Sequence, residues 1–402
     1  MSTVVVLNRI PSTVTPLGDW LGEISDQVVL ITSPGSAPGY RGVFGRVVEA
    51  DPYTDGEAVP TAVGKILAEG GTSALVHLIE DDVLRASRLR DAHGLPGLRE
   101  AEALPFRDKY AMKQRVSAAG IRCPGFVVPD GSVDPAGLGE RFGWPLVAKP
   151  RLGSGSAGVT VVRDAGALKA RLAEMDPDDV MVEEYVPGAV FHIDGLMHEG
   201  RILASVASRY VNDCLAFHDA RPLGSAQLDP DHPEAVELDA FAAAVVAALP
   251  SVDFSPFHLE VFRREGDGEP VFCEIACRVG GAHVMECTTY ALGVNPARLH
   301  VRHQAGLEHG PAAVPTGPSG ARYGWLLVPP REGRLESVRA PEDMPWLRDF
   351  FVKTEVPHTF GAARWSTDSY LGFVVEGPDH TTVTARLRAC AEAVETLVTW
   401  SD

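Results

Sequence analysis

The sequence of 402 residues lacks any long apolar run, because no stretch approaches the roughly 20 residues that a membrane helix needs. Its first residues, MSTVVVLNRIPSTV, have neither the basic segment nor the long apolar segment of a signal peptide. A hydrophobic content of 45% nevertheless suffices for two or three domains with cores of their own. We therefore expect a globular protein of the cytoplasm with no membrane partner.

Cysteine is scarce, since six cysteines in a chain of this length are too few for a disulfide framework. We expect them to be reduced and buried. Cys273, Cys277, His283 and Cys287 have the residue types of a zinc site. Strand alternation is expected to place Cys273 and Cys277 away from the neighbouring polar side chains, and no paired short-spacing ligands follow. A zinc site is therefore disfavoured.

Positive charge is scarce as well: 36 lysines and arginines face 54 aspartates and glutamates, a net charge of −18. This balance opposes a nucleic-acid partner, because such binding depends on lysines and arginines that neutralise phosphates. A small anion in a local basic pocket is still compatible with it. Only six lysines accompany thirty arginines, so a lysine in an apolar context stands out, although such a side chain often only snorkels to the surface.

Apolar strand-like runs alternate with helical patterns from residue 4 to about 95. This alternation predicts βαβ units and a parallel sheet, hence a Rossmann-like domain over 1–104. No Gly-x-Gly-x-x-Gly follows the first run, which argues against a bound dinucleotide.

The rest of the chain divides into three further units. The stretch FRDKYAMKQRVSAAG predicts an amphipathic helix that ends at Gly120 and opens a small α+β module over 105–189. A strand-rich unit with one long helix follows over 190–315. The proline-rich segment PAAVPTGPSG marks a boundary, after which 316–402 form a small α+β appendage.

The stretch HLEVFRREGDGEPVFCEIACRVGG predicts two antiparallel strands joined by a turn at Asp267, with glycines on both sides. If the turn is centred on Asp267, Glu260 lies directly opposite Glu274. Strand alternation then predicts one shared face, which carries His258, Glu260 and Phe262 on the first strand and Phe272, Glu274, Ala276 and Arg278 on the second.

Two carboxylates in a cross-strand pair repel each other, so a compensating charge is needed. A bridging divalent cation would supply it, and two hard oxygen ligands suit Mg²⁺. A solvated sheet face, or a register slipped by one residue, would equally remove the conflict, and the pattern alone does not separate these three possibilities.

A glycine- and serine-rich loop follows the apolar strand that ends at Lys149, in WPLVAKPRLGSGSAGVTVV. Its backbone N–H groups and hydroxyls can close over phosphates, although such a loop is more often a flexible turn. It is not a P-loop, because no Gly-Lys-Ser/Thr follows and the next element is a strand. Further on, Glu183 and Glu184 end the apolar strand of VMVEEYVPG.

Taken in order, these motifs resemble the ATP-grasp superfamily, and within it the carboxylate–amine ligases of the L-amino acid (dipeptide) ligase type. The resemblance is strongest over 105–310 and rests on the ordered set FRDKYAMKQRVSAAGI, PLVAKPRLGSGSAGV, VMVEEYVPG, HIDGLMHEGRI, HLEVF and CEIACRVGG. It implies an α/β and α+β protein: a Rossmann-like (pre-ATP-grasp) domain, a two-subdomain ATP-grasp fold and the C-terminal α+β appendage.

The resemblance also implies an ATP site. Lys109 and Lys149 would hold the phosphates beneath a mobile glycine loop, Arg209 would contact a phosphate, and Glu183 would meet the adenine amino group. The implied nucleotide-binding residues are Lys109, Lys149, Gly153, Ser154, Gly155, Ser156, Glu183, Glu184, Tyr185, Val186 and Arg209.

Glu260 and Glu274 match the carboxylates that ligate Mg²⁺, with Mn²⁺ as an alternative ion. Arg278, with Lys149, would stabilise the reacting groups, and Arg278, Gly281 and His283 would shape the substrate pocket. The chain departs from the family pattern twice: PGAVF has no acidic residue for the ribose, and Ala276 stands where many members have Asn.

The implied reaction joins a carboxylate substrate to an amine, both expected to be amino acids, through an acyl phosphate, with release of ADP and phosphate. The alternatives are an ATP-dependent carboxylase that activates bicarbonate and a catalytically silent nucleotide-binding module. The absence of a Met-Lys-Met segment counts against the carboxylase. A homodimer is expected from the resemblance alone.

Overall fold

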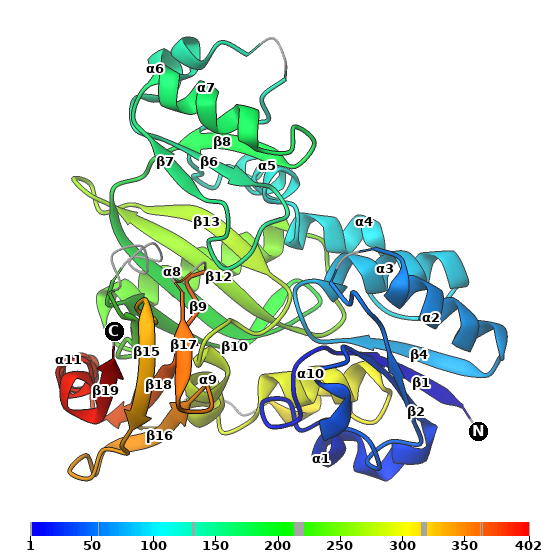
Figure 1. Ribbon diagram of the computed structural model, residues 1–402. Coiled ribbons are helices and arrows are strands. Elements are labelled where there is room, and N and C mark those ends of the chain that lie inside the picture. The colour runs from blue at the N-terminus through cyan, green and yellow to red at the C-terminus, as the bar shows by residue number, and fades with distance from the viewer. Residues whose placement is uncertain are drawn as a thin grey trace.

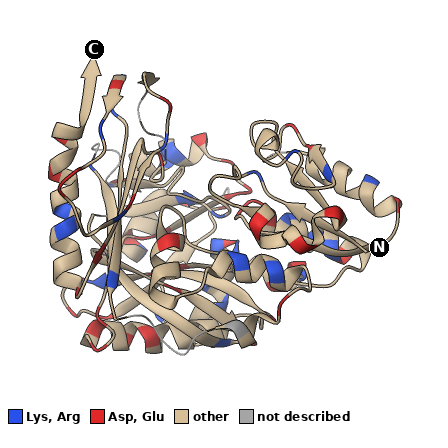
Figure 2. Cartoon of the chain, turned by 90° about the horizontal axis from the view of Figure 1, so that it is seen from below, with Lys and Arg blue, Asp and Glu red and all other residues tan. Residues whose placement is uncertain are grey.

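The computed structural model describes residues 2–401 except 55, 131–132, 213–220, 315–319, 362 and 364. It contains one parallel sheet and three antiparallel sheets, which confirms the expected mixture of α/β and α+β architecture. Figure 1 shows the N-terminal sheet at the lower right, a small sheet at the top and a large sheet that runs from the centre to the lower left. Figure 2 shows acidic and basic residues interspersed along the chain.

The N-terminal sheet is parallel, with the strand order β3-β2-β1-β4. Its strands are β1 (Thr3–Leu7), β2 (Val28–Thr32), β3 (Arg46–Glu49) and β4 (Thr72–His77). One face packs against α2 (Ala58–Ala68) and α3 (Asp82–His93), and the other against α1 (Leu17–Leu21). A helix from much later in the chain, α10 (Pro296–Gln304), covers the same face as α1, which local sequence patterns did not indicate.

The small sheet has the order β5-β8-β6-β7 and carries the glycine-rich loop between β6 and β7. Its strands are β5 (Phe126–Val127), β6 (Leu146–Pro150), β7 (Thr160–Val162) and β8 (Val180–Glu184). Two helices, α6 (Pro135–Phe142) and α7 (Ala165–Glu174), bury Leu138 and Leu168 against one face. The helix α5 (Lys109–Ala118) precedes this unit, after α4 (Glu100–Ala103).

The large sheet has eight antiparallel strands in the order β13-β12-β9-β10-β11-β14-β18-β16. They are β9 (Gly188–His198), β10 (Arg201–Tyr210), β11 (Leu223–Gln227), β12 (Ser255–Arg264), β13 (Pro270–Ala276), β14 (Arg322–Val328), β16 (Leu347–Val352) and β18 (Leu371–Gly377). One face is covered by α8 (Pro233–Ala248) and α11 (His380–Leu397), and the other by α9 (Val284–Leu292). The sheet therefore has a buried apolar face and a face that is partly polar.

The expected appendage over 316–402 contributes β14, β16 and β18 to the large sheet. It also forms a small sheet of its own from β15 (Gly333–Val338), β17 (His358–Phe360) and β19 (Val398–Ser401). The expected boundary between 315 and 316 touches residues outside the described part of the chain.

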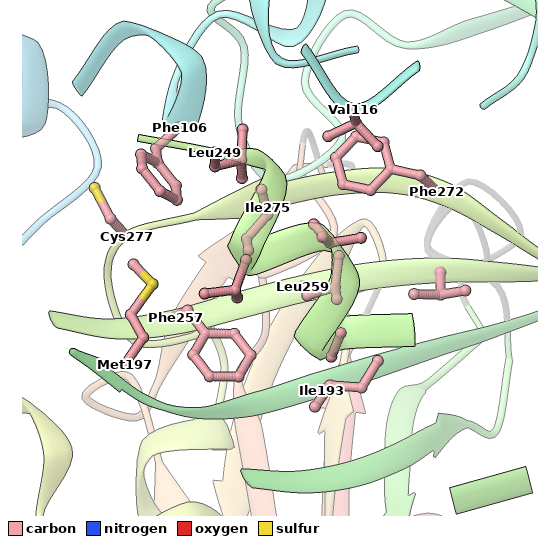
Figure 3. Packing of buried hydrophobic residues seen from close by; sticks show 14 of the residues in the cluster. Phe106, Val116, Ile193, Met197, Leu249, Phe257, Leu259, Phe272, Ile275 and Cys277 are labelled. Atoms are coloured by element: carbon pink, nitrogen blue, oxygen red, sulfur yellow. The ribbon is translucent and has the colours of Figure 1, made fainter. Parts of the chain in front are cut away.

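The main core lies between the large sheet and the helices α5 and α8 (Figure 3). In this view Ile275 lies near Leu249 and Phe257 near Met197, and all four belong to the same core. Among the described residues, no helix combines the length and the apolar character of a membrane span.

Candidate active site

The predicted glutamate pair is confirmed: β12 and β13 are antiparallel, and Glu260 lies opposite Glu274. The turn between them has Gly266 and Gly268 with positive φ on either side of Asp267. Just beyond Glu260 the register shifts, so that Val261 pairs with Phe272 and one residue of β13 is left over. This is a β-bulge at Cys273.

The bulge corrects the expected placement of two side chains. Phe272 is fully buried in the core with Ile275 rather than on the face of the glutamates. The Sγ of Cys273 lies 3.9 Å from Oε2 of Glu260, although alternation had placed this thiol on the opposite face. The extra residue inverts the alternation along β13, because two residues there oppose one on β12. Cys273 and Cys277 are free thiols.

The two glutamates lie among polar partners from three other elements. Oε1 of Glu260 accepts a hydrogen bond of 2.8 Å from the Tyr210 hydroxyl, and Nζ of Lys109 lies 3.2 Å from Oε2 of Glu274. Burial raises the pKa of Glu274, but the positive charges of Lys109 and Lys149 together have the larger effect. The pKa is therefore lowered from its ordinary value to about 2. Glu274 is therefore ionised at neutral pH and presents a carboxylate beside Glu260.

Lys149 and Glu183 form a buried ion pair between β6 and β8. Burial lowers the pKa of Lys149, but the Glu183 carboxylate raises it well above its usual range. A third residue joins them: Nζ of Lys113 lies 3.3 Å from Oε2 of Glu183 and donates a 2.8 Å hydrogen bond to the carbonyl of Cys273. Glu183, expected at the adenine, is thus held between two lysines.

Sequence reasoning missed Lys113, although two signals pointed to it. Lysines are rare in this chain, and Lys113 follows Lys109 by four residues on α5, which places both on one helix face. Its side chain is fully buried, with the ammonium 5.3 Å from the centre of the Phe272 ring.

The residues expected to form the hinge follow Glu183 at the end of β8. A carboxylate oxygen of Glu184 accepts the backbone N–H of Gly125 at 3.0 Å, Tyr185 is exposed, and Val186 is buried.

The glycine-rich loop is held from two sides. Lys109 Nζ donates to the carbonyl of Gly153 at 2.5 Å, so this lysine joins the loop to Glu274. The backbone N–H and the hydroxyl of Ser366 both donate to the carbonyl of Gly155, at 3.2 and 3.1 Å. Gly155 and Ser156 have positive φ, a conformation that tightens the loop. The structure thus brings Lys109, the loop and Glu274 together.

Arg278 lies just beyond β13 and forms an ion pair with Glu80, which follows β4 of the N-terminal sheet. It also donates a 2.7 Å hydrogen bond to the carbonyl of Val279. Burial lowers the pKa of Arg278, while Glu80 and the two site glutamates raise it. Glu80 in turn lies 3.2 Å from Arg107, and no sequence signal linked these distant residues.

The two expected pocket residues lie beyond Arg278. His283 is buried, and its ring stacks on Phe351 with 4.2 Å between ring centres. Gly281 is exposed and lies near Thr367.

Arg209 is not brought to the other predicted residues. Its guanidinium lies over the ring of Phe191, 5.6 Å from the ring centre, on the sheet face that packs against α8. The adjacent Tyr210 reaches Glu260 on the opposite face. Neighbouring residues of a strand point to opposite faces, so the placement of Tyr210 directs Arg209 away from the glutamates.

No family model matches the chain. The chain is 29% identical over 268 residues to the L-arginine-specific L-amino acid ligase of Bacillus subtilis, across 65% of this chain and 64% of that protein. It is 30% identical over 184 residues to the D-alanine–D-alanine ligase of Gloeobacter violaceus, across 42% of this chain and 57% of that protein. The matches thus span less than two thirds of the length of these relatives.

Solved structures extend the likeness to the whole chain. The L-amino acid ligase of Bacillus licheniformis superposes with a TM-score of 0.74 at 17% identity, over 100% of this chain and 98% of that one. The N5-carboxyaminoimidazole ribonucleotide synthetase of Thermotoga maritima superposes with a TM-score of 0.67 at 15% identity, over the full length of both. The fold and the relatives confirm the resemblance to ATP-grasp carboxylate–amine ligases. Among these, the chain resembles the L-amino acid ligases.

Proposed function

We propose that this protein is an ATP-dependent ligase that joins the carboxylate of one amino acid to the amine of another through an acyl phosphate, releasing ADP and phosphate. The observation that carries the proposal is the grouping of Glu260, Glu274, Lys109 and Lys149, in which Lys109 contacts a glycine-rich loop. The likeness to an L-amino acid ligase and to D-alanine–D-alanine ligases supports the same reaction class.

Glu260 and Glu274 are the residues that would hold Mg²⁺. Their carboxylates face each other across two strands, and both offer the hard oxygen donors that this ion prefers. Glu274 is ionised at neutral pH, so the donor set fits a divalent cation. The bound ion would neutralise charge on the triphosphate, where two unit charges about 4 Å apart repel by about 4 kcal/mol at an effective dielectric constant near 20.

Lys109 and Lys149 are proposed to hold the ATP phosphates, with the loop that contains Gly153 and Gly155 as the lid. Lys109 already contacts the loop carbonyl of Gly153, so one side chain can couple phosphate binding to loop position. The end of β8, from Glu183 to Val186, is proposed as the adenine hinge. Such a lid excludes water, which would otherwise hydrolyse the acyl phosphate.

In the first step, an oxygen of the substrate carboxylate attacks the γ-phosphorus of ATP, and the bond to the ADP oxygen breaks. In the second step, the amine attacks the acyl carbon, phosphate leaves, and the nitrogen loses a proton to give the amide. Arg278 is half-buried and feels the charge of both glutamates, which supports a proposed role in stabilising negative charge as it develops. Gly281 and His283 are proposed to shape the substrate pocket that follows Arg278.

The proposal is tested by measuring ADP release from ATP and Mg²⁺ with pairwise pools of amino acids, and by mass spectrometry of the products. A product mass equal to the two substrates less water establishes the ligase. Glu274→Ala is expected to abolish turnover in a folded protein, and Lys149→Ala to weaken nucleotide binding. ADP release that requires bicarbonate would replace the ligase by a carboxylase. Nucleotide binding without turnover would leave only a binding module.

The expected homodimer is also a proposal, which light scattering on the same preparation tests.

A further inference from the structure

A buried row of polar side chains lies next to Glu260 on the same face of the large sheet. In the register of β9 and β12, His192 pairs with Glu260 and Asp194 pairs with His258. His192, Asp194 and His258 are 2%, 4% and 7% exposed, which is unusual for three ionisable residues in contact. The proposed reaction uses none of them.

Asp194 is the centre of this row. Its Oδ1 accepts a 2.7 Å hydrogen bond from Nδ1 of His258, and its Oδ2 is hydrogen-bonded to Nδ1 of His192. The other ring nitrogen of His192 lies 2.6 Å from the hydroxyl of Ser225 on β11. Both carboxylate oxygens of Asp194 therefore have an imidazole partner, and each imidazole has its orientation fixed.

The row ends at the proposed metal ligand. Nε2 of His258 lies 3.6 Å from Oε1 of Glu260, the same oxygen that accepts the hydrogen bond from Tyr210. His258 and Tyr210 thus constrain this carboxylate group from two strands, β12 and β10. Groups behind a metal ligand that fix its orientation affect metal affinity, typically by about 10- to 100-fold when they are removed.

Stability alone does not account for the row. Buried ionic groups carry a desolvation cost that often equals or exceeds their mutual attraction, so apolar residues could fill this part of the sheet at no loss. The side chains along β12 alternate between Leu259 in the apolar core and the polar residues His258 and Glu260. The polar residues lie on the face that carries the glutamate pair, which indicates that they serve the function of that pair.

We propose that Asp194 and His258 are positioning residues that hold the carboxylate of Glu260 toward Glu274 for a divalent cation. This inference rests on the proposed function, because it assigns Glu260 to the metal. Asp194 acts through His258 and does not touch the metal. The effect of losing either residue is therefore a weaker affinity for the ion rather than a loss of the chemistry itself.

The same three side chains, two histidines and one carboxylate, also have their ligand atoms within 4.8 Å of one another, as in a metal site. The hydrogen bonds favour the positioning role, because Asp194 already uses one oxygen for each imidazole. Elemental analysis of the purified protein separates the two roles. One equivalent of zinc or iron that is lost in Asp194→Asn would overturn the proposal.

The test is a titration with Mn²⁺, read by electron paramagnetic resonance in the presence of a non-hydrolysable ATP analogue. It compares the unaltered protein with Asp194→Asn, which keeps the size of the side chain but cannot accept from both imidazoles. The matched control is Asp239→Asn on α8, where the aspartate accepts a hydrogen bond from Ser205 away from the glutamate pair. The dissociation constant for Mn²⁺ is expected to rise about 10- to 100-fold in Asp194→Asn and to stay unchanged in Asp239→Asn.

An unchanged Mn²⁺ affinity in a folded Asp194→Asn protein would refute the inference. If that variant does not fold, His258→Gln is the second variant. It leaves the bond between Asp194 and His192 in place and is expected to weaken Mn²⁺ binding by the same factor. The readout requires no turnover, so an unaltered protein that binds Mn²⁺ and the nucleotide analogue but forms no amide contradicts the ligase and not the positioning role.

Discussion

Replacing Lys113 by Met tests the buried charge cluster that sequence reasoning missed. The side chain of Lys113 is fully buried, and its ammonium lies 3.3 Å from Oε2 of Glu183 and donates to the carbonyl of Cys273. Methionine has a similar length and flexibility and fills the same space. The substitution therefore removes the charge and the hydrogen bonds while it leaves little cavity.

The expected destabilisation follows from the geometry. Two unit charges 3.3 Å apart attract by about 5 kcal/mol at an effective dielectric constant of about 20. Lys149 still pairs with Glu183 in the variant, so the carboxylate is not left alone. Removing one partner of a buried ion pair costs about 3–5 kcal/mol, and we expect Lys113→Met near the lower end of that range.

Urea unfolding followed by circular dichroism measures this loss. Lys169→Met on the exposed surface of α7 is the control and is expected to change the free energy of unfolding by less than about 0.5 kcal/mol. In a double-mutant cycle with Glu183→Gln, the double variant is expected to lose less stability than the sum of the single losses. A loss below about 1 kcal/mol for Lys113→Met, or strict additivity, would refute the assignment.

Three further outcomes are expected. Burial, with the charges of His303 and Arg90, lowers the pKa of His300 to about 3 in the folded protein, against about 6.5 in the unfolded chain. Below pH 6.5 the unfolded chain therefore takes up a proton that the folded protein does not. We expect about 2 kcal/mol of folding stability to be lost between pH 6.5 and pH 5 for this reason. The free energy of unfolding in urea should therefore differ less between pH 7.5 and pH 5 in His300→Gln than in the unaltered protein. An equal difference in both proteins would contradict the role of His300. Ser366→Ala should speed backbone hydrogen exchange in the glycine-rich loop, because the Ser366 hydroxyl donates a hydrogen bond to the loop carbonyl of Gly155. An exchange rate equal to that of the unaltered protein would show that this bond does not restrain the loop. Arg209→Ala should leave the KM for ATP unchanged, and a raised KM would restore Arg209 to the nucleotide site.

Local patterns in the sequence predicted the strands, the turn at Asp267 and the pairing of Glu260 with Glu274, because each depends on only a few adjacent residues. The same counting failed at Cys273. A bulge adds one residue to one strand, and the sequence of β13 contains no glycine that would signal it, while its one proline stands at the first position of the strand. Simple alternation therefore assigned Cys273 and Phe272, which precede Glu274 on β13, to the wrong faces of the sheet.

Contacts between distant elements were beyond local reasoning for a different reason. The ion pair of Arg278 with Glu80 joins residues 198 positions apart, and it forms only because the N-terminal sheet lies beside the large one. The docking of α10 on the N-terminal sheet has the same cause. Neither contact can be predicted from a periodic pattern in the sequence.

The charge pairs in the site show how nucleotide and metal are expected to depend on each other. Lys109, proposed for phosphate, is paired with Glu274, proposed for the metal, and Lys149 is paired with Glu183, proposed for the adenine hinge. A cation bound to Glu274 would weaken the ion pair of this carboxylate with Lys109 and would free the ammonium for a phosphate. A phosphate bound to Lys109 would free Glu274 for the cation in the same way. Because binding linkage is reciprocal, each ligand should raise the affinity for the other by the same factor.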